Sequence, residues 1–522
     1  MADHVIERAT PRVASLDRYS PAVLLSLAFA FGILAQYLFY RSALGINVGI
    51  ASLVILAIAW RLRPTGARVD PLDRWIVPAA IVFAFLPALR VDLMLLLFDV
   101  PASLVLITMA AVSFAGVPLT RRAVDILVIL GLVAVGRIVA GGALLLAAFP
   151  DLGRPLARRS GGRIASVGMG MALAFPFLVV FALLFASADA VFSSAVNNVF
   201  DFRKWSIGEL IGRALLAAAF AWVAGGLFIV AGRRTDTTMP AVLPRLRGLL
   251  SSTAGATTLL AIDALFVFFV GLQIAYLFGG IDTLNATGLT YSTYARRGFF
   301  ELIAVAVLAG GLLFAVELVV AKRSRVYVGA ALTLTLATLV IVVSAAYRMH
   351  LYQLAYGWTE QRFYAFAGIA WLGAGGGCAA VLVWRDATRW LLHAGGLIAL
   401  AVAIAVHVIG PSALVARQNL ERVVNPRGLP ADASRALDAQ YLASLGDGAL
   451  PTLLEYLPRL DGSDREALGF ALRLAALQGR DLSPAAVPSF SVDRERARQA
   501  LLTLVDELRT YPPVRGGHIG LR

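Results

Sequence analysis

The stretch FFELIAVAVLAGGLLFAVELVV, residues 299–320, decides the fold of this chain. It is apolar almost throughout, and its length is what a helix needs to cross roughly 30 Å of hydrocarbon. Uniform apolarity differs from the alternating pattern of a barrel strand. Within a bilayer, a helix satisfies all backbone hydrogen bonds of such a segment internally. The stretch therefore predicts a transmembrane helix.

Similar blocks occupy most of the first 410 residues and predict an all-α, polytopic bundle of about twelve spans, give or take one. The predicted spans are 21–40, 43–60, 75–89, 97–117, 124–148, 164–186, 207–231, 257–279, 299–320, 326–346, 363–384 and 390–409. The block Trp75–Leu89 is short and could merge with the next one, because only Arg90 and Asp92 interrupt the apolar run. A polar segment, residues 1–20, precedes the first span.

Composition supports this reading. Of the 522 residues, 59% are hydrophobic and 15% are charged, and the mean hydropathy is +0.79. Soluble domains are about 45–50% apolar and about 25% charged. The single cysteine, Cys378, excludes a disulfide within the chain and a thiolate metal cage.

The net charge of +14 belongs to the membrane part. After Pro411 the chain has 14 Arg and 13 acidic residues, so nearly all of the positive excess lies in the loops between spans. This pattern is typical of loops that face anionic headgroups, and it argues against a nucleic-acid partner for the tail.

The charges do not fix the orientation, because all loops of a twelve-span arrangement carry about fifteen Lys and Arg on each side. In the later half, the loops after residues 153, 232, 321 and 384 hold thirteen, against six on the opposite side. These richer loops favour the cytoplasmic side, which would place the tail on the extracytoplasmic side. An odd number of spans would reconcile this preference with the first half.

The tail after Pro411 predicts a small helical extramembrane domain, residues 411–522. Leucines recur at helical spacing from Leu437 onward, and the stretch Val492–Arg509 predicts one more amphipathic helix. Ser463 and Glu466 have the spacing of a capping box. This domain is a candidate docking surface for a protein partner.

The string YSTYARRGFFE, residues 291–301, stands between two predicted spans. Further notable stretches are Leu44–Asn47, Ala186–Phe192, Arg348–Tyr352, Tyr356–Thr359, Asn419–Arg422 and Leu437–Leu445. Together they resemble a bacterial membrane-protein family catalogued as domain of unknown function 4173, from residue 44 to about residue 460. Ala190 and Gln418 depart from its pattern. The resemblance implies a multi-pass protein of the bacterial inner membrane, without an assigned activity.

Two loops offer polar and aromatic groups suited to an anion, a sugar or a lipid headgroup. The candidate residues are Tyr291, Tyr294, Arg296, Arg297, Glu301, Arg348, Tyr352, Tyr356, Glu360 and Arg362. An aromatic and basic belt that anchors span ends at the interface explains the same residues.

Ionisable groups inside spans are costly and usually face a bundle interior. The candidates are Arg137, Glu209, Arg213, Asp263 and Glu317. Glu209 and Arg213 have the spacing of an ion pair, whereas Asp263 and Arg137 have no partner nearby in the sequence. They would pair across helices or line a polar path.

Three functions stay open. The first is transport or sensing of an anionic or amphipathic, lipid-linked molecule. The second is a membrane-embedded transferase that acts on a lipid-linked substrate, with Asp189, Glu301 or Glu360 as the base. The third is a structural scaffold. The sequence has no zinc helix, phosphate loop or nucleophile elbow, so it predicts no metal and no cofactor.

Overall fold

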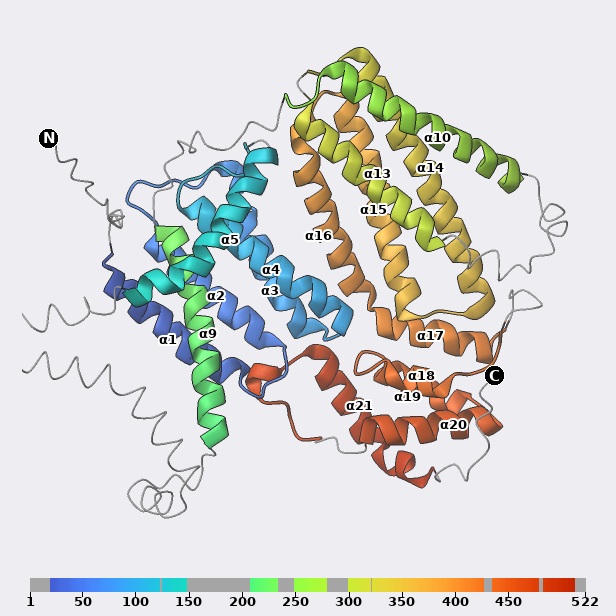
Figure 1. The fold of residues 1–522 in the computed structure, drawn as a ribbon. Helices are drawn as coiled ribbons and strands as arrows, with labels where there is room; N and C mark the ends of the chain where they lie inside the picture. The colour runs from blue at the N-terminus through green and yellow to red at the C-terminus, as the bar shows by residue number, and fades with distance from the viewer. Residues whose placement is uncertain are drawn as a thin grey trace, which may run out of the picture. The chain divides into compact units, whose positions relative to one another are not determined.

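The structure is a computed structural model. It describes residues 19–122, 124–147, 207–232, 248–278, 299–320, 322–426, 434–477 and 482–511. In these ranges every regular element is a helix (Figure 1). Leu250 and Val320 form an isolated β-bridge. The predicted all-α fold is confirmed for this part of the chain.

The chain divides into two compact units, with boundaries inside α3, α4 and α5. The helices before residue 233 are α1 (Pro21–Phe39), α2 (Ile46–Leu62), η1 (Pro71–Asp73), α3 (Ile76–Leu89), α4 (Leu93–Phe114), α5 (Val124–Ala147) and α9 (Ile207–Gly232). The later spans are α10 (Ser252–Phe278), α13 (Phe299–Val319), α14 (Arg325–Tyr356), α15 (Glu360–Trp384), η4 (Thr388–Trp390) and α16 (Leu391–Ile409). The short segment Leu86–Leu97 groups with these later helices in the second unit.

Nine helical segments in the described ranges are long and apolar enough to cross a membrane. Helix α2 and the Leu130–Ala143 part of α5 are apolar but shorter. Eleven of the predicted blocks coincide with helices, while the block 164–186 lies outside the described residues. Helices α3 and α4 do not merge, because residues 90–92 between them are not helical.

In the first unit, α1 packs along α9, and α2 packs on both. A Cβ at Gly32 would lie only 2.3 Å from the carbonyl oxygen of Ala217, so glycine allows this close approach. The Asn47 side chain is fully buried and accepts a hydrogen bond from the Gly45 N–H at 2.8 Å. Leu44–Asn47, one of the stretches on which the family resemblance rests, is therefore a turn that stabilises the start of α2.

In the second unit, α14 is central and packs against α10, α13 and α15, while α16 packs against α15 (Figure 1). Helices α10 and α14 run in the same direction. A Cβ at Gly255 would lie 3.4 Å from the Tyr327 ring, and eighteen residues later Gln273 accepts a hydrogen bond from Ser344 at 2.7 Å. The bundle therefore has two ends, one at the α13–α14 turn and one at the α14–α15 turn.

The tail continues directly from α16 and groups with it in the second unit. Its helices are α17 (Pro411–Val424), α18 (Ala439–Ser444), α19 (Leu450–Tyr456), η5 (Leu457–Arg459), α20 (Gly462–Leu472), η6 (Arg473–Leu477), η7 (Val487–Ser489) and α21 (Val492–Thr510). Buried leucines such as Leu453 and Leu501 join them in one core. The final amphipathic helix is confirmed, and Ser491 caps it.

The predicted capping box is wrong. Helix α20 begins at Gly462, one residue before Ser463, and Asp461 occupies the N-cap position without a side-chain hydrogen bond. Ser463 therefore lies inside the first turn. The sequence spacing fits a capping box, but the helix starts too early for Ser463 to be the cap.

Candidate functional site

The end of the second unit at the α13–α14 turn is basic. Lys322, Arg325, Arg385 and Arg389 are exposed there. Arg323 instead turns inward and forms an ion pair with Glu317 at 3.4 Å, and both side chains are less than a tenth exposed. It also pairs with Asp386 and donates to the Val383 carbonyl at 3.0 Å. These contacts join the α13–α14 turn to the end of α15.

At the other end of the second unit, side chains of α17 form hydrogen bonds with main-chain groups of the α14–α15 turn. Asn419 accepts a hydrogen bond from the Trp358 N–H at 2.9 Å and donates to the Trp358 carbonyl at 2.8 Å. Arg422 donates to the carbonyls of Leu354 and Ala355 at 3.0 and 3.3 Å. Two stretches that carried the family resemblance, the late aromatic loop and Asn419–Arg422, thus contact each other. Burial lowers the pKa of the Arg422 guanidinium.

The aromatic residues of this turn are largely occupied by contacts within the chain. The Arg362 guanidinium lies over the Tyr352 ring, 4.2 Å from its centroid, and donates to the Gly357 carbonyl. Tyr352 and Tyr356 pack edge to face, with centroids 5.1 Å apart. These contacts describe a rigid turn, and they leave fewer groups for a ligand than the sequence indicates.

Glu360 lies in a small polar cluster beside this turn. Its carboxylate accepts a hydrogen bond from the Ser412 hydroxyl at 2.9 Å, and the Asp92 carboxylate lies 3.4 Å from the same hydroxyl. The Tyr441 hydroxyl accepts from the Glu360 N–H at 2.9 Å, and burial raises the pKa of this phenol. Asp92 also caps α4, accepting from the Met94 N–H at 2.8 Å.

Arg90 connects the end of α16 with the tail. It donates to the His407 carbonyl at 2.6 Å and pairs with Asp493 at 3.4 Å. Gly410 has φ +74°, and a Cβ there would lie 2.6–2.8 Å from the guanidinium. Burial raises the pKa of the Asp493 carboxyl, and Arg90 opposes that rise. In the sequence, Arg90 and Asp92 only interrupt an apolar run, and nothing there indicates that they contact the residues around α16, α17 and α21.

The predicted anion-binding residues do not come together as one group in the described ranges. Tyr291, Tyr294, Arg296 and Arg297 lie outside the described residues, as does Asp189. Glu301 is exposed at the start of α13. Arg348 donates to the side-chain amide oxygen of Gln273 on α10 at 3.4 Å, whereas Glu360 contacts Ser412 of α17. A binding role for these residues stays a prediction.

The predicted intramembrane groups differ in their surroundings. Arg137 is exposed on α5. Glu209 and Arg213 form their ion pair at 2.9 Å, and Arg213 also donates to Gln36 and lies over the Tyr40 ring. Glu317 pairs with Arg323.

Asp263 is different. Its side chain is only 5% exposed, and neither carboxylate oxygen has a hydrogen-bond partner among the described residues. It lies near the middle of α10.

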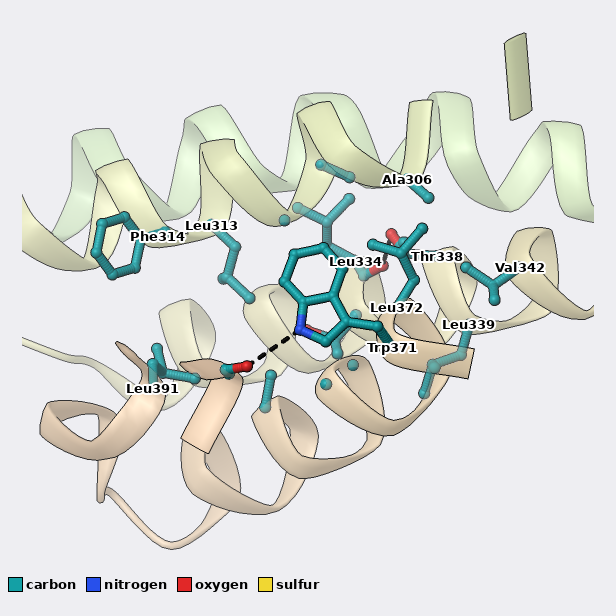
Figure 2. A pocket seen from close by; sticks show the side chains of 17 residues that line it. Ala306, Leu313, Phe314, Leu334, Thr338, Leu339, Val342, Trp371, Leu372 and Leu391 are labelled. Atoms are coloured by element: carbon teal, nitrogen blue, oxygen red, sulfur yellow. Dashed lines mark hydrogen bonds between the residues drawn. The ribbon is translucent and has the colours of Figure 1, made fainter. Parts of the chain in front are cut away.

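A cavity of about 200 Å³ lies between α13, α14, α15 and α16 (Figure 2). Its lining is mainly apolar, and the side chains that give it shape include Leu313, Phe314, Leu334, Thr335, Thr338, Leu339, Val342, Trp371, Leu372 and Leu391. Figure 2 shows the Trp371 indole among these side chains, with its N–H donating to the Gly395 carbonyl at 3.0 Å. The indole therefore fixes α15 against α16 beside the cavity.

Glycines give the cavity part of its space. A Cβ at Gly375 or Gly310, both of which line it, would meet nothing within 4 Å. The spacing of Gly373 and Gly377, four residues apart, predicts close helix packing, but a Cβ at Gly377 also meets nothing, and one at Gly373 only reaches Val342 at 4.0 Å. Gly376 makes the close approach, 2.8 Å from Leu339. Sequence reasoning missed the cavity because small residues serve packing and open space alike.

The cavity is large enough for a small hydrocarbon group. An apolar cavity of about 150 Å³ is large enough for benzene, so this one accommodates a comparable or slightly larger apolar group. The Thr335 and Thr338 hydroxyls donate to carbonyls one turn back, at 2.7 Å each, and so add little polarity. No group of three or more His, Cys, Asp or Glu in the described ranges could hold a metal ion.

A comparison with protein-family models matches residues 77–456 to a family described as a domain of unknown function, DUF4153. This family differs from the one that the sequence resemblance named, although both are domains of unknown function. No curated protein and no solved structure matches the chain. The chain is a membrane protein with several apolar helices. Because the match spans most of its length, it belongs to the DUF4153 family.

Proposed function

We propose that this protein binds an anionic, amphipathic molecule from the bilayer, as the first step in transporting or sensing it. The cavity between α13 and α16 carries the proposal, because it offers an apolar space among membrane spans. Of the nine candidate spans in the described ranges, Glu360–Trp384 (α15) and Thr388–Ile409 (η4 and α16) have the smallest share of residues buried within the protein. Much of their surface is therefore available to lipid, which gives a hydrophobic molecule a lateral route to the cavity.

The basic end supplies the charge for an anionic headgroup. Leu391, which lines the cavity, begins α16 directly after η4, and η4 contains the exposed Arg389. Arg385 precedes η4 and is also exposed. Each such cation near a membrane surface contributes about 1 kcal/mol of attraction to anionic lipid. The hydrocarbon part would occupy the cavity while the headgroup contacts Arg385 and Arg389.

The same geometry supports an orientation in the bacterial inner membrane. The basic turns at Lys322–Arg325 and Arg385–Arg389 lie together, joined by Arg323 and Asp386. The tail contacts the α14–α15 turn at the other end. By the positive-inside rule, the basic end would be cytoplasmic and the tail extracytoplasmic.

The transferase alternative has less support. A base and an anion clamp would need a carboxylate and several arginines that converge, but Glu360 contacts Ser412, and Arg362 lies over Tyr352. The scaffold alternative draws on the tight contacts between α17 and the α14–α15 turn, and the tail remains a candidate surface for a protein partner. Neither alternative accounts for the cavity.

The test is binding of phosphatidylglycerol to the purified full chain, followed by native mass spectrometry in detergent. Gly375→Leu and Gly310→Leu would fill the cavity, and we expect each to weaken binding by about tenfold or more. Gly377→Leu and Gly311→Leu are matched controls, because these glycines also have free space around them but do not line the cavity. Equal binding by all four variants would overturn the proposal.

The headgroup is tested separately. Replacing Arg385 and Arg389 by Gln should weaken phosphatidylglycerol binding by about fivefold for each charge. Binding of phosphatidylcholine, which has no net charge, should not change. If both lipids lose affinity equally, the basic end does not select an anion.

A further inference from the structure

Asp263 is a carboxyl group buried in the middle of a membrane span. Only 5% of its side chain is exposed, and neither oxygen has a partner among the described residues. An isolated carboxylate is very unfavourable in such surroundings, so it is either neutralised by a proton or paired. Its burial therefore needs an explanation that packing alone does not give.

The neighbouring charges do not supply a partner. Helix α10 packs mainly on α14, where the nearest titratable side chains along the sequence are Tyr327 toward the basic end and Tyr347 and Arg348 toward the other end. On α13, Glu317 is already paired with Arg323, and Glu301 is exposed at the opposite end of the helix. No cationic side chain of these helices lies level with Asp263.

The register of the two helices places Asp263 opposite the cavity wall. Gly255 lies beside Tyr327, and Gln273 bonds to Ser344. Counting eight residues forward from the first contact, or ten back from the second, puts residues 334 and 335 of α14 level with Asp263. Leu334 and Thr335 both line the cavity. The carboxyl group is therefore level with the part of α14 that lines the cavity.

We propose that Asp263 is a proton-binding site and that its protonation controls occupancy of the cavity that α14 lines at the same level. The protonated form is neutral and allows α10 and α14 to pack closely. After loss of the proton, the carboxylate requires water, which loosens the α10–α14 contact and shifts Leu334 and Thr335. The control of occupancy rests on the proposed function, whereas the proton site itself does not.

The proton site is tested on the purified full chain by infrared spectroscopy. We expect a band from a protonated carboxyl group that is absent in Asp263→Asn and present in Glu301→Gln, which changes an exposed carboxylate. Melting temperature is then followed from about pH 5 to about pH 10. Wild type and Asp263→Asn should have similar values at low pH, and the variant should be more stable at high pH.

Two results would overturn the proton site. One is the absence of a band specific to Asp263. The other is a lower stability of Asp263→Asn at neutral pH, because that would show an ionised carboxylate paired with a cation.

Control of the cavity is tested with phosphatidylglycerol. Wild-type affinity should change by about tenfold between low and high pH, while the affinity of Asp263→Asn should stay constant. An equal pH dependence in both proteins would refute control by Asp263. If phosphatidylglycerol does not bind at any pH, the proposed function fails, and the infrared band still decides the proton site.

Discussion

Replacing Arg422 by Met is a sharp test of how the tail is attached. The Arg422 side chain is buried and donates to the carbonyls of Leu354, Ala355 and Ser434 at 3.0, 3.3 and 3.0 Å. Leu354 and Ala355 belong to the last turn of α14, where carbonyls have no partner within the helix. Arg422 therefore completes the hydrogen bonding at the end of this helix.

The expected cost follows from these contacts. Ala355 keeps a second donor, the Ser434 N–H at 3.0 Å. Ser434 is exposed, so water can replace Arg422 at its carbonyl, and the Leu354 carbonyl is the less accessible group that loses its donor. A hydrogen bond to a charged donor contributes about 1.5–3 kcal/mol, and an unsatisfied buried carbonyl costs about 1–3 kcal/mol. Relief from burying the guanidinium offsets part of this loss. We expect local stability to fall by about 2–4 kcal/mol.

The assay is hydrogen exchange of the segment 352–360 and of α17, measured by mass spectrometry on the full chain. A loss of 2–4 kcal/mol would speed exchange by roughly thirty- to several-hundred-fold. Arg417→Met is the matched control, because Arg417 is exposed on the same helix. If the two variants exchange at similar rates, the contacts of Arg422 do not stabilise this end of the bundle.

Three further outcomes are expected from denaturation of the full chain in detergent. Arg323→Met should cost about 3–5 kcal/mol because it leaves Glu317 buried and unpaired, and adding Glu317→Gln should recover part of the loss; no recovery would contradict the ion pair. Gly410→Ala should cost more than Gly446→Ala, since both positions have positive φ but a Cβ meets Arg90 only at Gly410; equal losses would show that Arg90 moves freely. Burial raises the pKa of Asp493 above 3.8, so the folded chain retains this proton to higher pH and the group's contribution to stability falls as pH rises through the raised pKa. Asp493→Asn should therefore gain stability relative to wild type as the pH rises from about 4 through the raised pKa, and a relative loss would mean that pairing with Arg90 outweighs burial.

The sequence predicts the spans well, because burial in hydrocarbon acts on each apolar block separately. Helices α13 and α16 begin and end within a few residues of their predicted bounds. Helix α14 extends ten residues beyond its predicted end at 346, because its last turns contact α17 and do not depend on apolarity. The polar side chains from Arg348 onward lower the mean hydropathy, so a hydropathy scan ends the predicted span before the helix ends.

The candidate sites were harder to predict because their contacts join residues far apart in the sequence. Glu360 contacts Ser412, and Arg90 contacts Asp493. These residues are too far apart in the sequence for a local pattern to indicate the contacts. Short-range pairs such as Glu209 and Arg213 were accessible, since helix geometry fixes them. The cavity depends on where Gly375 and Gly310 face, and composition does not reveal that.

The hydrogen bonds between α17 and the α14–α15 turn affect how the sequence of this protein can diverge during evolution. Asn419 and Arg422 form hydrogen bonds with main-chain groups of Leu354, Ala355 and Trp358. The Tyr441 hydroxyl accepts a hydrogen bond from the main-chain N–H of Glu360. Peptide groups are common to all residue types, so these contacts constrain the backbone path of the turn more than its amino-acid sequence. Evolution is thereby free to exchange the outward side chains of this turn, and to alter what they meet outside the chain, without detaching the tail.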